Sequence, residues 1–384
     1  MHIERLVLTN FRNFASADVS FAERGNLIAG PNAQGKTNLL EAIHVLCVGR
    51  SHRDRREENL VRFGETFYRV EGSFRHIGVK TTIEVAYTEE RKRIRINGKE
   101  ARPATLIGRV PAVISSPDDI DMIKRSPAYR RAFLDLALSQ VSREYLVNLQ
   151  QYARALAHRN MLIKRWQEGD VSPGESDAWD EALLDRGEKI VRARLEFLAE
   201  IEPEVASGFS TIGGEVAHVE LVYEPRGYSL GTQAAGGVED AGARDRTDVK
   251  EGLRQALRAA RRLELARGFT LFGPHVDDFK FMSEGRDIRL FGSEGEQRTA
   301  VLALRCAEVA IMRTKLGYHP IVLLDDVFAE LDERRSAALT SLISGFDQII
   351  LTSSRPAGLE GRGLDGMIVA EGRVTYGGRS SGSA

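Results

Sequence analysis

The fold of this chain can be read from one segment, Gly30-Pro31-Asn32-Ala33-Gln34-Gly35-Lys36-Thr37. It matches the pattern Gly-x-x-x-x-Gly-Lys-[Ser/Thr], in which glycines let backbone amides turn toward phosphate oxygens. In this pattern Lys36 brings a positive charge to the β- and γ-phosphates, and Thr37 offers a hydroxyl to Mg²⁺. The segment therefore predicts a phosphate-binding loop in which all eight residues contact a nucleotide.

A short apolar run and an amphipathic pattern flank this loop, which is the setting that the motif requires. Leu27-Ile28-Ala29 ends directly at Gly30 and is predicted to be a buried strand. Apolar residues at helical spacing follow the loop: Leu39, Leu40, Ala42, Ile43 and Leu46. The positive end of that helix would add to the attraction for phosphate. We therefore expect a strand–loop–helix unit that binds ATP, with Asn38 in the first helical turn among the nucleotide-binding residues.

The overall composition limits the classes of partner. Of the 384 residues, 42% are hydrophobic and 28% are charged, and the formal net charge is −1, so a nucleic-acid contact must come from a local patch. Cys47 and Cys306 lack metal-binding spacing and are expected to be buried thiols. The charged N-terminus does not resemble a signal peptide, and no apolar run reaches the roughly 18 residues that span a bilayer. We expect a cytoplasmic protein without membrane contact.

The pattern of elements predicts an α/β domain that is interrupted by helices. Residues 66–100 alternate like antiparallel strands, with a hairpin turn at Asn97-Gly98. Residues 127–167 and 177–206 are each amphipathic at helical spacing and are predicted to be two long helices that form an antiparallel arm. The Gly- and Ala-rich residues 229–247 are expected to be a flexible loop rather than an ordered functional one.

Two apolar runs, Ile321–Leu324 and Ile349–Leu351, are typical of buried parallel strands and return the chain to the first domain. We expect an ATPase head whose N-terminal part is 1–112 and whose C-terminal part is 266–376. Residues 113–265 would form the mostly helical inserted arm, and 377–384 a flexible tail.

Two carboxylates, Asp325 and Asp326, follow the strand Ile321–Leu324 directly. In P-loop enzymes such an aspartate holds Mg²⁺, and a second carboxylate can orient the attacking water. We assign Asp325, together with Thr37, to the metal, and Asp326, together with Lys36, to catalysis. A solvated carboxylate pair at a strand end is the alternative. Because Asp326 is one methylene shorter than the usual glutamate, we expect slow hydrolysis.

Ser293 and Gly295 stand at the start of another amphipathic pattern. A serine hydroxyl and free amides at a helix start can bind an anion. The alternative is a capping box, in which Ser293 and Glu296 satisfy each other's backbone amides. The position of the pair, upstream of Asp325, favours the anion site.

The order of these motifs resembles that of an ABC-type ATPase: a P-loop, a serine–glycine signature helix, an acidic strand end, and then Asp332 in the position of a D-loop. More narrowly, the chain resembles the RecF family of DNA-repair proteins, which are relatives of the SMC ATPases. The blocks that carry this resemblance, besides the P-loop and Asn38, are Leu8-Thr9-Asn10-Phe11-Arg12-Asn13-Phe14, Gly49-Arg50-Ser51-His52-Arg53, Ser116-Pro117-Asp118-Asp119-Ile120, Arg130-Arg131-Ala132-Phe133-Leu134-Asp135, Gly273-Pro274-His275 with Asp277-Asp278, and Asp325-Asp326-Val327 with Glu330-Leu331-Asp332. The insertion is too short for the coiled coil of SMC proteins.

The resemblance implies an ABC/SMC-type fold and a shared site. Two ATP molecules would be bound between two heads, so that Ser293, Gly295 and Asp332 of one copy meet the nucleotide of the other in an ATP-dependent homodimer. Arg12 and Asn13 would lie near the nucleotide. The implied role is in recombinational repair, replication and the SOS response: binding duplex or gapped DNA and helping RecR and RecO to load a RecA-type recombinase.

The sequence departs from these patterns at several positions. Glu296 occupies what reads as the signature glutamine position, and Val276 stands where an arginine is usual in the RecF block. The switch histidine is absent from Leu351-Thr352-Ser353-Ser354, and no Q-loop glutamine is visible near Ser115-Ser116. We therefore assign neither role. His275 with Asp277 and Asp278 has the composition of a metal site, but a hydrogen-bonded turn is the expected structure.

A cluster of arginines is the candidate for DNA contact: Arg50, Arg53, Arg55 and Arg56. Such residues contact phosphates without reading sequence, although a solvated charged face is the alternative. A second basic run, Arg91-Lys92-Arg93 with Arg95, surrounds a predicted hairpin. The motor subunit of an ABC transporter and a small-molecule P-loop kinase remain competing functions. The long helical insertion disfavours the first, and a kinase would need neither Ser293 nor Asp332.

Overall fold

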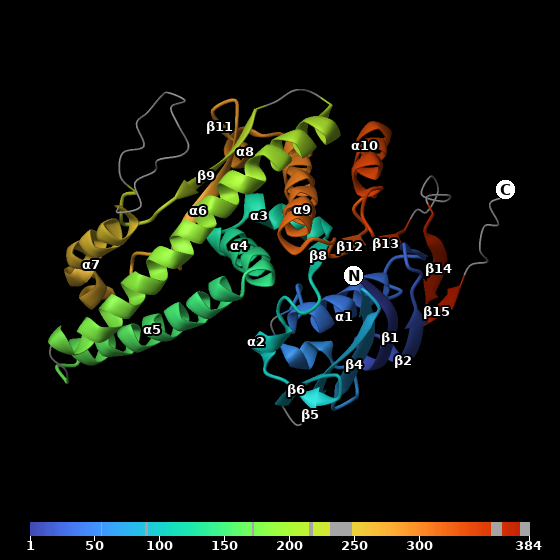
Figure 1. The fold of residues 1–384 in the computed structure, drawn as a ribbon, viewed down its shortest axis with the longest axis horizontal. Helices are drawn as coiled ribbons and strands as arrows, with labels where there is room; N and C mark the ends of the chain where they lie inside the picture. Colours follow the sequence, from blue (N-terminus) through green and yellow to red (C-terminus); the bar gives the residue numbers. More distant parts are fainter. Residues whose placement is uncertain are drawn as a thin grey trace. The chain divides into compact units, whose positions relative to one another are not determined.

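The computed structural model describes residues 1–54, 56–88, 91–170, 173–214, 218–230, 248–354 and 363–376 (Figure 1). The chain divides into two compact units. We call the first, which contains Met1–Ile120, Glu204–Ala217 and Arg298–Ala384, the head unit. The second, which contains Asp121–Pro203 and His218–Gln297, is the arm unit. Residues 231–247 of the expected flexible loop, and the tail 377–384, lie outside the described residues.

The central sheet of the head unit has the strand order β15-β14-β3-β13-β12-β8. Five of its strands are parallel and β15 (Arg373–Tyr376) is antiparallel. The parallel strands are β3 (Gly25–Ala29), β8 (Ala112–Ser115), β12 (Ile321–Asp325), β13 (Ile349–Ser353) and β14 (Asp365–Ala370). β8, β12 and β13 are buried along their whole length, as apolar strands in parallel sheets are. Because β3 and β12 both flank β13, their carboxyl ends lie at the same edge of the sheet.

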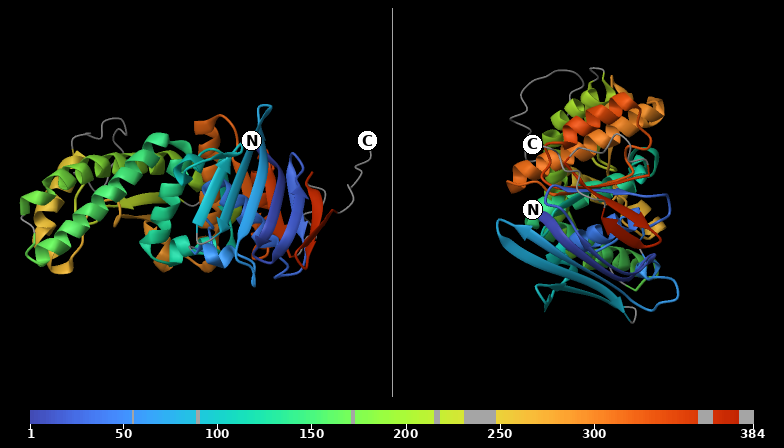
Figure 2. Two further views of the ribbon diagram at one scale, coloured as in Figure 1. Left: turned by 90° about the horizontal axis from the view of Figure 1, so that it is seen from below. Right: turned by 90° about the vertical axis from the view of Figure 1, so that its right-hand side faces the viewer.

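The second sheet of the head unit is antiparallel, with the order β2-β1-β4-β5-β6-β7, and Figure 2 shows its strands in blue to cyan side by side. The strands are β1 (His2–Phe11), β2 (Phe14–Ser20), β4 (Tyr68–His76), β5 (Val79–Thr88), β6 (Arg91–Ile96) and β7 (Lys99–Glu100). Asn97 and Gly98, with φ of 50° and 76°, form the turn between β6 and β7. The antiparallel strands and the hairpin turn predicted for residues 66–100 are therefore confirmed.

Helices complete the head unit. The helix α1 (Lys36–Val48) contacts β12, β8 and β13 of the central sheet as well as β4 and β5 of the antiparallel one. The shorter elements are η1 (Glu57–Leu60), α2 (Pro103–Leu106), η2 (Pro117–Ile120) and α10 (Glu333–Ile343). The helix α9 (Glu294–Leu316) begins in the arm unit and continues into the head unit. Cys47 on α1 is buried as predicted, whereas Cys306 on α9 is only partly buried.

The arm unit is mostly helical and contains one small sheet. Its helices are α3 (Asp121–Lys124), α4 (Pro127–Val141), α5 (Arg143–Gln167), η3 (Pro173–Ser176), α6 (Asp177–Gly213, whose end belongs to the head unit), α7 (Asp248–Arg267) and α8 (Ile288–Phe291). Its sheet has the order β11-β10-β9, formed by β9 (Val219–Glu224), β10 (Asp278–Ser283) and β11 (Arg286–Asp287). No helix within the described ranges is long and apolar enough to cross a bilayer.

The two long helices of the arm run antiparallel, as Figure 1 shows for α5 and α6. Two side-chain hydrogen bonds between the helices show this. Arg159 of α5 bonds to Asp180 of α6, whereas Asn148, earlier in α5, bonds to Arg186, later in α6. The helix predicted for residues 127–167 is in fact two helices. Ser142 between them has an extended backbone, and its hydroxyl accepts a hydrogen bond from the amide of Tyr145 in the first turn of α5.

The unit boundaries differ from those that we expected, 113–265 for the arm and 266–376 for the C-terminal part of the head. Residues 266–297 belong to the arm unit, because β10 pairs with β9 along its whole length. The last turns of α6, from Glu204, belong instead to the head unit. Ser293 and Gly295 therefore lie in the arm unit, whereas Asp325, Asp326 and Asp332 lie in the head unit.

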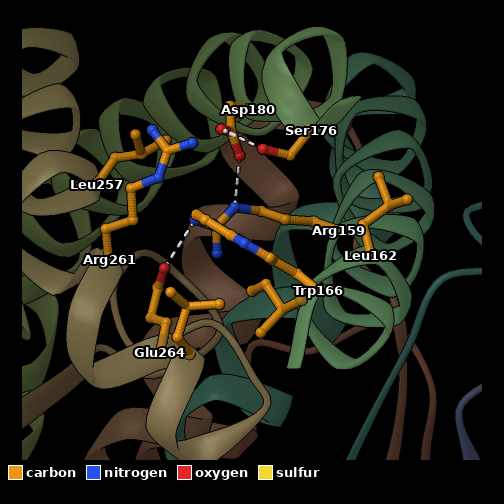
Figure 3. A pocket seen from close by; sticks show the side chains of 10 residues that line it. Arg159, Leu162, Trp166, Ser176, Asp180, Leu257, Arg261 and Glu264 are labelled. Carbon is orange, nitrogen blue, oxygen red and sulfur yellow. Dashed lines mark hydrogen bonds and ion pairs between the residues drawn. The ribbon is translucent and has the colours of Figure 1, made fainter. Parts of the chain in front are cut away.

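One buried arginine joins three helices of the arm (Figure 3). Arg159 on α5 donates to Asp180 on α6 over 2.6 Å and to Glu264 on α7 over 2.7 Å. A third hydrogen bond of 2.7 Å goes to the hydroxyl of Thr270. Because every charge in this cluster has a partner, Arg159 can be buried and still hold the helices together.

The segment from Gly273 to Asp278 is a hydrogen-bonded turn, as expected. Asp277 is fully buried and accepts hydrogen bonds from the Tyr223 hydroxyl at 2.6 Å and the Arg226 amide at 2.9 Å. Asp278 forms an ion pair with Arg130. The Nδ1 of His275 lies 2.7 Å from the hydroxyl of Tyr152. These groups are occupied in holding β10 against the arm helices.

Candidate nucleotide site

The P-loop adopts a backbone that requires glycine at two positions. φ is 149° at Gly30 and 111° at Gly35. A Cβ at Gly30 would lie 2.3 Å from the carbonyl oxygen of Val369, and one at Gly35 would lie 2.6 Å from the side-chain nitrogen of Asn13. Both positions therefore combine a left-handed backbone with a close neighbour. The helix α1 begins directly after Gly35, which has no side chain to cap the amides of the first turn.

Lys36, the first residue of α1, turns back over the loop. Its Nζ donates hydrogen bonds to the carbonyl oxygens of Gly30 at 2.7 Å and Pro31 at 2.8 Å. Burial lowers the pKa of Lys36, and the nearby carboxylates of Asp326 and Asp325 act in the opposite direction. The ammonium group thus lies inside the loop that the motif assigns to phosphate.

Asp325 ends β12 and is held between two hydroxyl groups. Thr37 on α1 donates to its Oδ1 over 2.9 Å, and Thr352 at the end of β13 donates to the same oxygen over 2.7 Å. Burial raises the pKa of Asp325, although both hydrogen bonds and Arg53 oppose that shift. The structure therefore brings together the two residues that the sequence assigned to Mg²⁺.

Asp326 has a different environment, although it is the next residue. Its backbone is left-handed, with φ of 50°. Its amide donates to the carbonyl oxygen and the hydroxyl of Thr352 at 3.2 and 3.0 Å. The amide of Ser354 donates to its carboxylate over 3.1 Å. The chain turn at Asp326 thus brings its carboxylate to Ser354, directly after β13.

Arg12 is fixed by a buried carboxylate on the P-loop helix. Its Nε and Nη2 donate to the two oxygens of Glu41 over 2.9 and 2.7 Å, and Glu41 is fully buried. Its Nη1 donates to the carbonyl oxygen of Asn59 at 2.7 Å. Such a two-point ion pair fixes the guanidinium plane beside the start of α1.

A chain of amides connects the end of β1 to the P-loop. Asn13 donates to the carbonyl oxygen of Gln34 over 2.9 Å, and Asn38 donates to the side-chain oxygen of Asn13 over 2.8 Å. Arg53 continues the chain with a 3.3 Å hydrogen bond to Asn38. The structure thus brings Arg12, Asn13 and Asn38 to the loop, and it adds Arg53, which the sequence had grouped with the DNA-contact residues.

An open cleft of about 1030 Å³ adjoins this wall of the site. Arg12, Asn13, Asn38 and Arg53 line it. The segment from Val61 to Glu65 lines it as well, and Phe63 within that segment is 101% exposed.

The signature segment forms the capping box that was the alternative interpretation. The amide of Ser293 donates to the Glu296 carboxylate over 2.7 Å, and the amide of Glu296 donates to the Ser293 hydroxyl oxygen over 3.2 Å. Gly295 lies in the first turn of α9. Because the Ser293 hydroxyl accepts in this box, its own proton remains able to donate to an anion. Gln297, one residue beyond the position that we assigned to the signature glutamine, is buried in the same turn.

Asp332 occupies the N-cap of α10. Its carboxylate accepts a hydrogen bond of 2.8 Å from the amide of Arg335, and its side chain is 59% exposed. The preceding Glu330 forms an ion pair with Arg298 on α9. The residue assigned to a subunit interface is therefore accessible on the surface of the head unit.

The arginines proposed for DNA contact separate into two environments. Arg50, Arg53 and Arg56 are all exposed. Arg53 differs from the other two because it contacts Asn38 beside the P-loop and lies 3.9 Å from Glu41. Arg55 lies outside the described residues. The second basic run passes close to this segment, since Lys92 on β6 contacts the carbonyl oxygen of Gly49 and pairs with Glu57.

Sequence reasoning missed Glu41, Thr352 and Ser354. Glu41 follows the P-loop within an apolar helix, where a buried acid signals a cationic partner. Thr352 and Ser354 follow the apolar run Ile349–Leu351, so hydroxyl groups at the end of a parallel strand were visible in the sequence.

The family model of the RecF/RecN/SMC N terminal domain matches residues 2–370. The DNA replication and repair protein RecF of Moorella thermoacetica is 38% identical over 355 residues, which cover 92% of this chain and 90% of that protein.

Among solved structures, the chain is similar to RecF and to the heads of Smc proteins. The structure of the recombination mediator protein RecF with ATP, of the RecFOR pathway, has a TM-score of 0.87 and 32% identity, and 98% of each chain is covered. An Smc head bound to the C-terminal winged-helix domain of ScpA has a TM-score of 0.56 at 15% identity, which shows a shared fold.

Proposed function

Because the chain belongs to the RecF family of DNA replication and repair proteins, within the wider RecF/RecN/SMC group, we propose that it is an ATPase of recombinational repair that uses ATP and Mg²⁺. One observation carries this proposal: the catalytic motifs of the P-loop, β12 and β13 converge at one edge of the sheet. Lys36, Thr37, Asp325 and Thr352 come from these three segments and lie within hydrogen-bond reach of one another or of the loop.

The residues at this edge fit a magnesium ion. Thr37 and Asp325 present a hydroxyl and a carboxylate oxygen, the hard ligands that Mg²⁺ prefers. When bound, the ion would neutralise charge on the β- and γ-phosphates. The cation would also favour the charged form of Asp325, against the burial that raises its pKa.

Hydrolysis would depend on Lys36 and Asp326. Lys36 stabilises charge on the transferred phosphoryl group, and its present carbonyl partners, Gly30 and Pro31, are exchanged for phosphate oxygens. Asp326, oriented by the amide of Ser354, positions the attacking water. Its short side chain supports slow turnover, suited to a switch.

The complete site would need a second copy. Ser293 and Gly295 of one chain bind the γ-phosphate held by the P-loop of the other, with Asp332 near the same interface. The hydroxyl proton of Ser293 and the exposure of Asp332 support this proposal. ATP binding would close a homodimer around duplex or gapped DNA, and hydrolysis would open it.

DNA contact would be through phosphates, without sequence preference, and would involve Arg50, Arg55 and Arg56. Arg53, which contacts Asn38, is better suited to couple nucleotide and DNA. Within the RecFOR pathway named for its structural relative, the chain would help RecR and RecO to load a RecA-type recombinase. A transporter motor or a small-molecule kinase is not favoured, because the relatives are DNA-repair proteins over nearly the whole chain.

The test is the molecular mass in solution with and without ATP and gapped duplex DNA. We expect an ATP-dependent dimer that DNA strengthens and that Ser293→Arg abolishes, because the larger cation blocks the shared phosphate site. Lys36→Met, which removes the phosphate-binding charge, is the control for loss of ATP binding itself. A wild-type protein that remains monomeric under every condition would refute the proposal.

A further inference from the structure

Two large apolar side chains are exposed just before the signature residue Ser293. Leu290 and Phe291, at the end of α8, are each 70% exposed, and Arg289 beside them is also exposed. We call these three residues the knob. Exposed apolar side chains that adjoin one another mark interaction sites more often than isolated ones do.

Hydrogen bonds with Asp287 and Gln297 hold the backbone of the knob in place. The Asp287 carboxylate accepts a hydrogen bond of 2.8 Å from the amide of Arg289, and Ile288 is only 2% exposed. Gln297, itself 7% exposed, donates from its Nε2 to the carbonyl oxygens of Ile288 and Gly292, both over 3.2 Å. A Cβ at Gly292 would come 2.6 Å from the Ile288 carbonyl oxygen, so the turn closes tightly.

This construction makes the knob suitable for docking. A segment that is already fixed loses little conformational entropy when it binds, so its apolar area contributes to affinity. The buried side chain of Gln297 thus has a role that its position inside α9 does not otherwise explain: it fixes the backbone that presents Leu290 and Phe291.

The surface that the knob would meet follows from the proposed function, on which this inference rests. If Ser293 reaches the nucleotide of a second copy, Phe291 is two residues away and cannot lie more than about 7 Å further along the chain. The knob must then face the partner's surface beside its P-loop. We infer that this surface is the cleft lined by Asn38 and the Val61–Glu65 segment, because Asn13, which also lines it, bonds to Gln34 of the P-loop.

The cleft offers both kinds of complement that the knob needs. Phe63 is 101% exposed on its wall and can pack against Phe291 or Leu290. Glu58 and Glu65, which also line the cleft, are exposed carboxylates that suit Arg289, and Glu65 would exchange its present partner Arg62, at 3.8 Å, for Arg289. Because Arg12, Arg53 and Arg62 line the same cleft, packing on Phe63 is the main contribution. Aromatic residues and arginine are the residues that most often dominate binding energy at interfaces.

We propose that the knob, Arg289-Leu290-Phe291, docks on the Phe63 wall of the nucleotide cleft in a second copy of this chain. The contact supplies apolar area next to the shared phosphate site, so dimer affinity does not depend on ATP contacts alone.

Sedimentation of the full chain with Mg²⁺ and a non-hydrolysable ATP analogue gives the dimer dissociation constant. We expect Leu290→Ala with Phe291→Ala to weaken the dimer about tenfold to a hundredfold. Nucleotide binding by the monomer, measured with a fluorescent analogue, should not change, because the knob belongs to the arm unit and the P-loop to the head unit. Leu263→Ala, which truncates a residue 49% exposed on α7, is the matched control and should leave the dimer constant unchanged.

A double-mutant cycle identifies the partner surface. Phe63→Ala should weaken the dimer, and adding Phe291→Ala should cost less than it does in the wild type, because the two rings contact each other. Strictly additive effects would overturn the pairing of the knob with Phe63.

The outcomes separate the two proposals. If the wild type dimerises, Ser293→Arg does not, and the knob variants dimerise like the wild type, then the knob proposal is wrong while the shared ATP site stands. If the wild type never dimerises, both are wrong. Weaker dimers from the knob variants and a normal Leu263→Ala dimer would support both.

Discussion

At the scale of single residues, Asp325 places a carboxylate where folding alone disfavours it. Burial raises its pKa above the ordinary 3.8, so the folded protein holds a proton at this group more tightly than the unfolded chain does. The associated stabilisation is complete below that ordinary value and is lost as the pH rises through the folded-state pKa. At neutral pH without a cation, the charged form of Asp325 therefore costs stability.

We predict that Asp325→Asn stabilises the nucleotide-free protein near pH 7 by about 1 kcal/mol while abolishing Mg²⁺-dependent ATP hydrolysis. An amide lacks the charge that is costly to bury and can still accept hydrogen bonds from Thr37 and Thr352. Thermal unfolding from about pH 3 to about pH 7, a range that begins below the ordinary pKa of 3.8, should show a weaker fall in stability with rising pH than in the wild type. Asp326→Asn, which removes the neighbouring carboxylate that Thr37 does not contact, is the control for loss of charge alone. Equal destabilisation by both changes would contradict the prediction.

The sequence could predict Lys36, Thr37 and Asp325 as candidate site residues because their motifs are local: each residue lies at a fixed offset from a glycine loop or a buried strand. It could not identify Glu41 or Thr352 as parts of the site. Their roles come from tertiary neighbours, since Arg12 reaches Glu41 from the turn between β1 and β2, and Thr352 reaches Asp325 from the adjacent strand.

At the scale of elements, a buried cation, Arg159, links three helices of the arm. Arg159 lies between α5, α6 and α7 and satisfies both Asp180 and Glu264 (Figure 3). Such a cluster adds little net stability compared with apolar side chains of the same shape, but removing only one partner leaves the others buried and uncompensated.

We predict that Arg159→Met destabilises the arm unit by about 3–5 kcal/mol, because Asp180 and Glu264 lose their counter-charge. The two tryptophans of the chain, Trp166 and Trp179, both lie in arm elements, so their fluorescence during urea unfolding reports on this unit. Arg165→Met removes an exposed arginine from the same helix and should change stability by less than about 0.5 kcal/mol. An unfolding midpoint for Arg159→Met equal to that of Arg165→Met would show that the cluster does not hold the helices together.

The spacing of apolar residues predicted which segments are helices, but it did not predict where each helix ends. Residues 127–167 have one continuous apolar stripe, and nothing in that stripe marks a break at Ser142. The break depends on the Ser142 hydroxyl capping a second helix, a competition between local hydrogen bonds that the apolar spacing does not encode.

At the scale of the whole molecule, the chain order predicted a split head, but it could not assign residues 266–297. Their place in the arm unit is decided by the pairing of β10 with β9, two strands about fifty residues apart in sequence. Long-range pairing of this kind leaves no local signal. Its consequence for function is that the signature residues and the P-loop belong to different units of one chain.

The arginines of the head unit carry the prediction for DNA. We expect Arg50→Ala with Arg56→Ala to weaken duplex binding equally for all sequences and to reduce the salt dependence of the binding constant by up to about two counterions. Both side chains are exposed and far more accessible to phosphates than the paired Arg12. Filter binding or fluorescence anisotropy over a series of salt concentrations measures both quantities, and Arg24→Ala, which truncates another exposed arginine of the head unit, is the matched control.

Arg53→Ala should behave differently from the Arg50→Ala, Arg56→Ala double variant and from the Arg24→Ala control. Because Arg53 donates to Asn38 and acts on Asp325, its loss should weaken nucleotide binding first, and DNA binding only when ATP is present. A DNA affinity that falls equally with and without ATP would place Arg53 with Arg50 and Arg56 on a common phosphate-binding surface. A salt dependence unchanged by Arg50→Ala with Arg56→Ala would instead move the DNA contact to the arginines on β6.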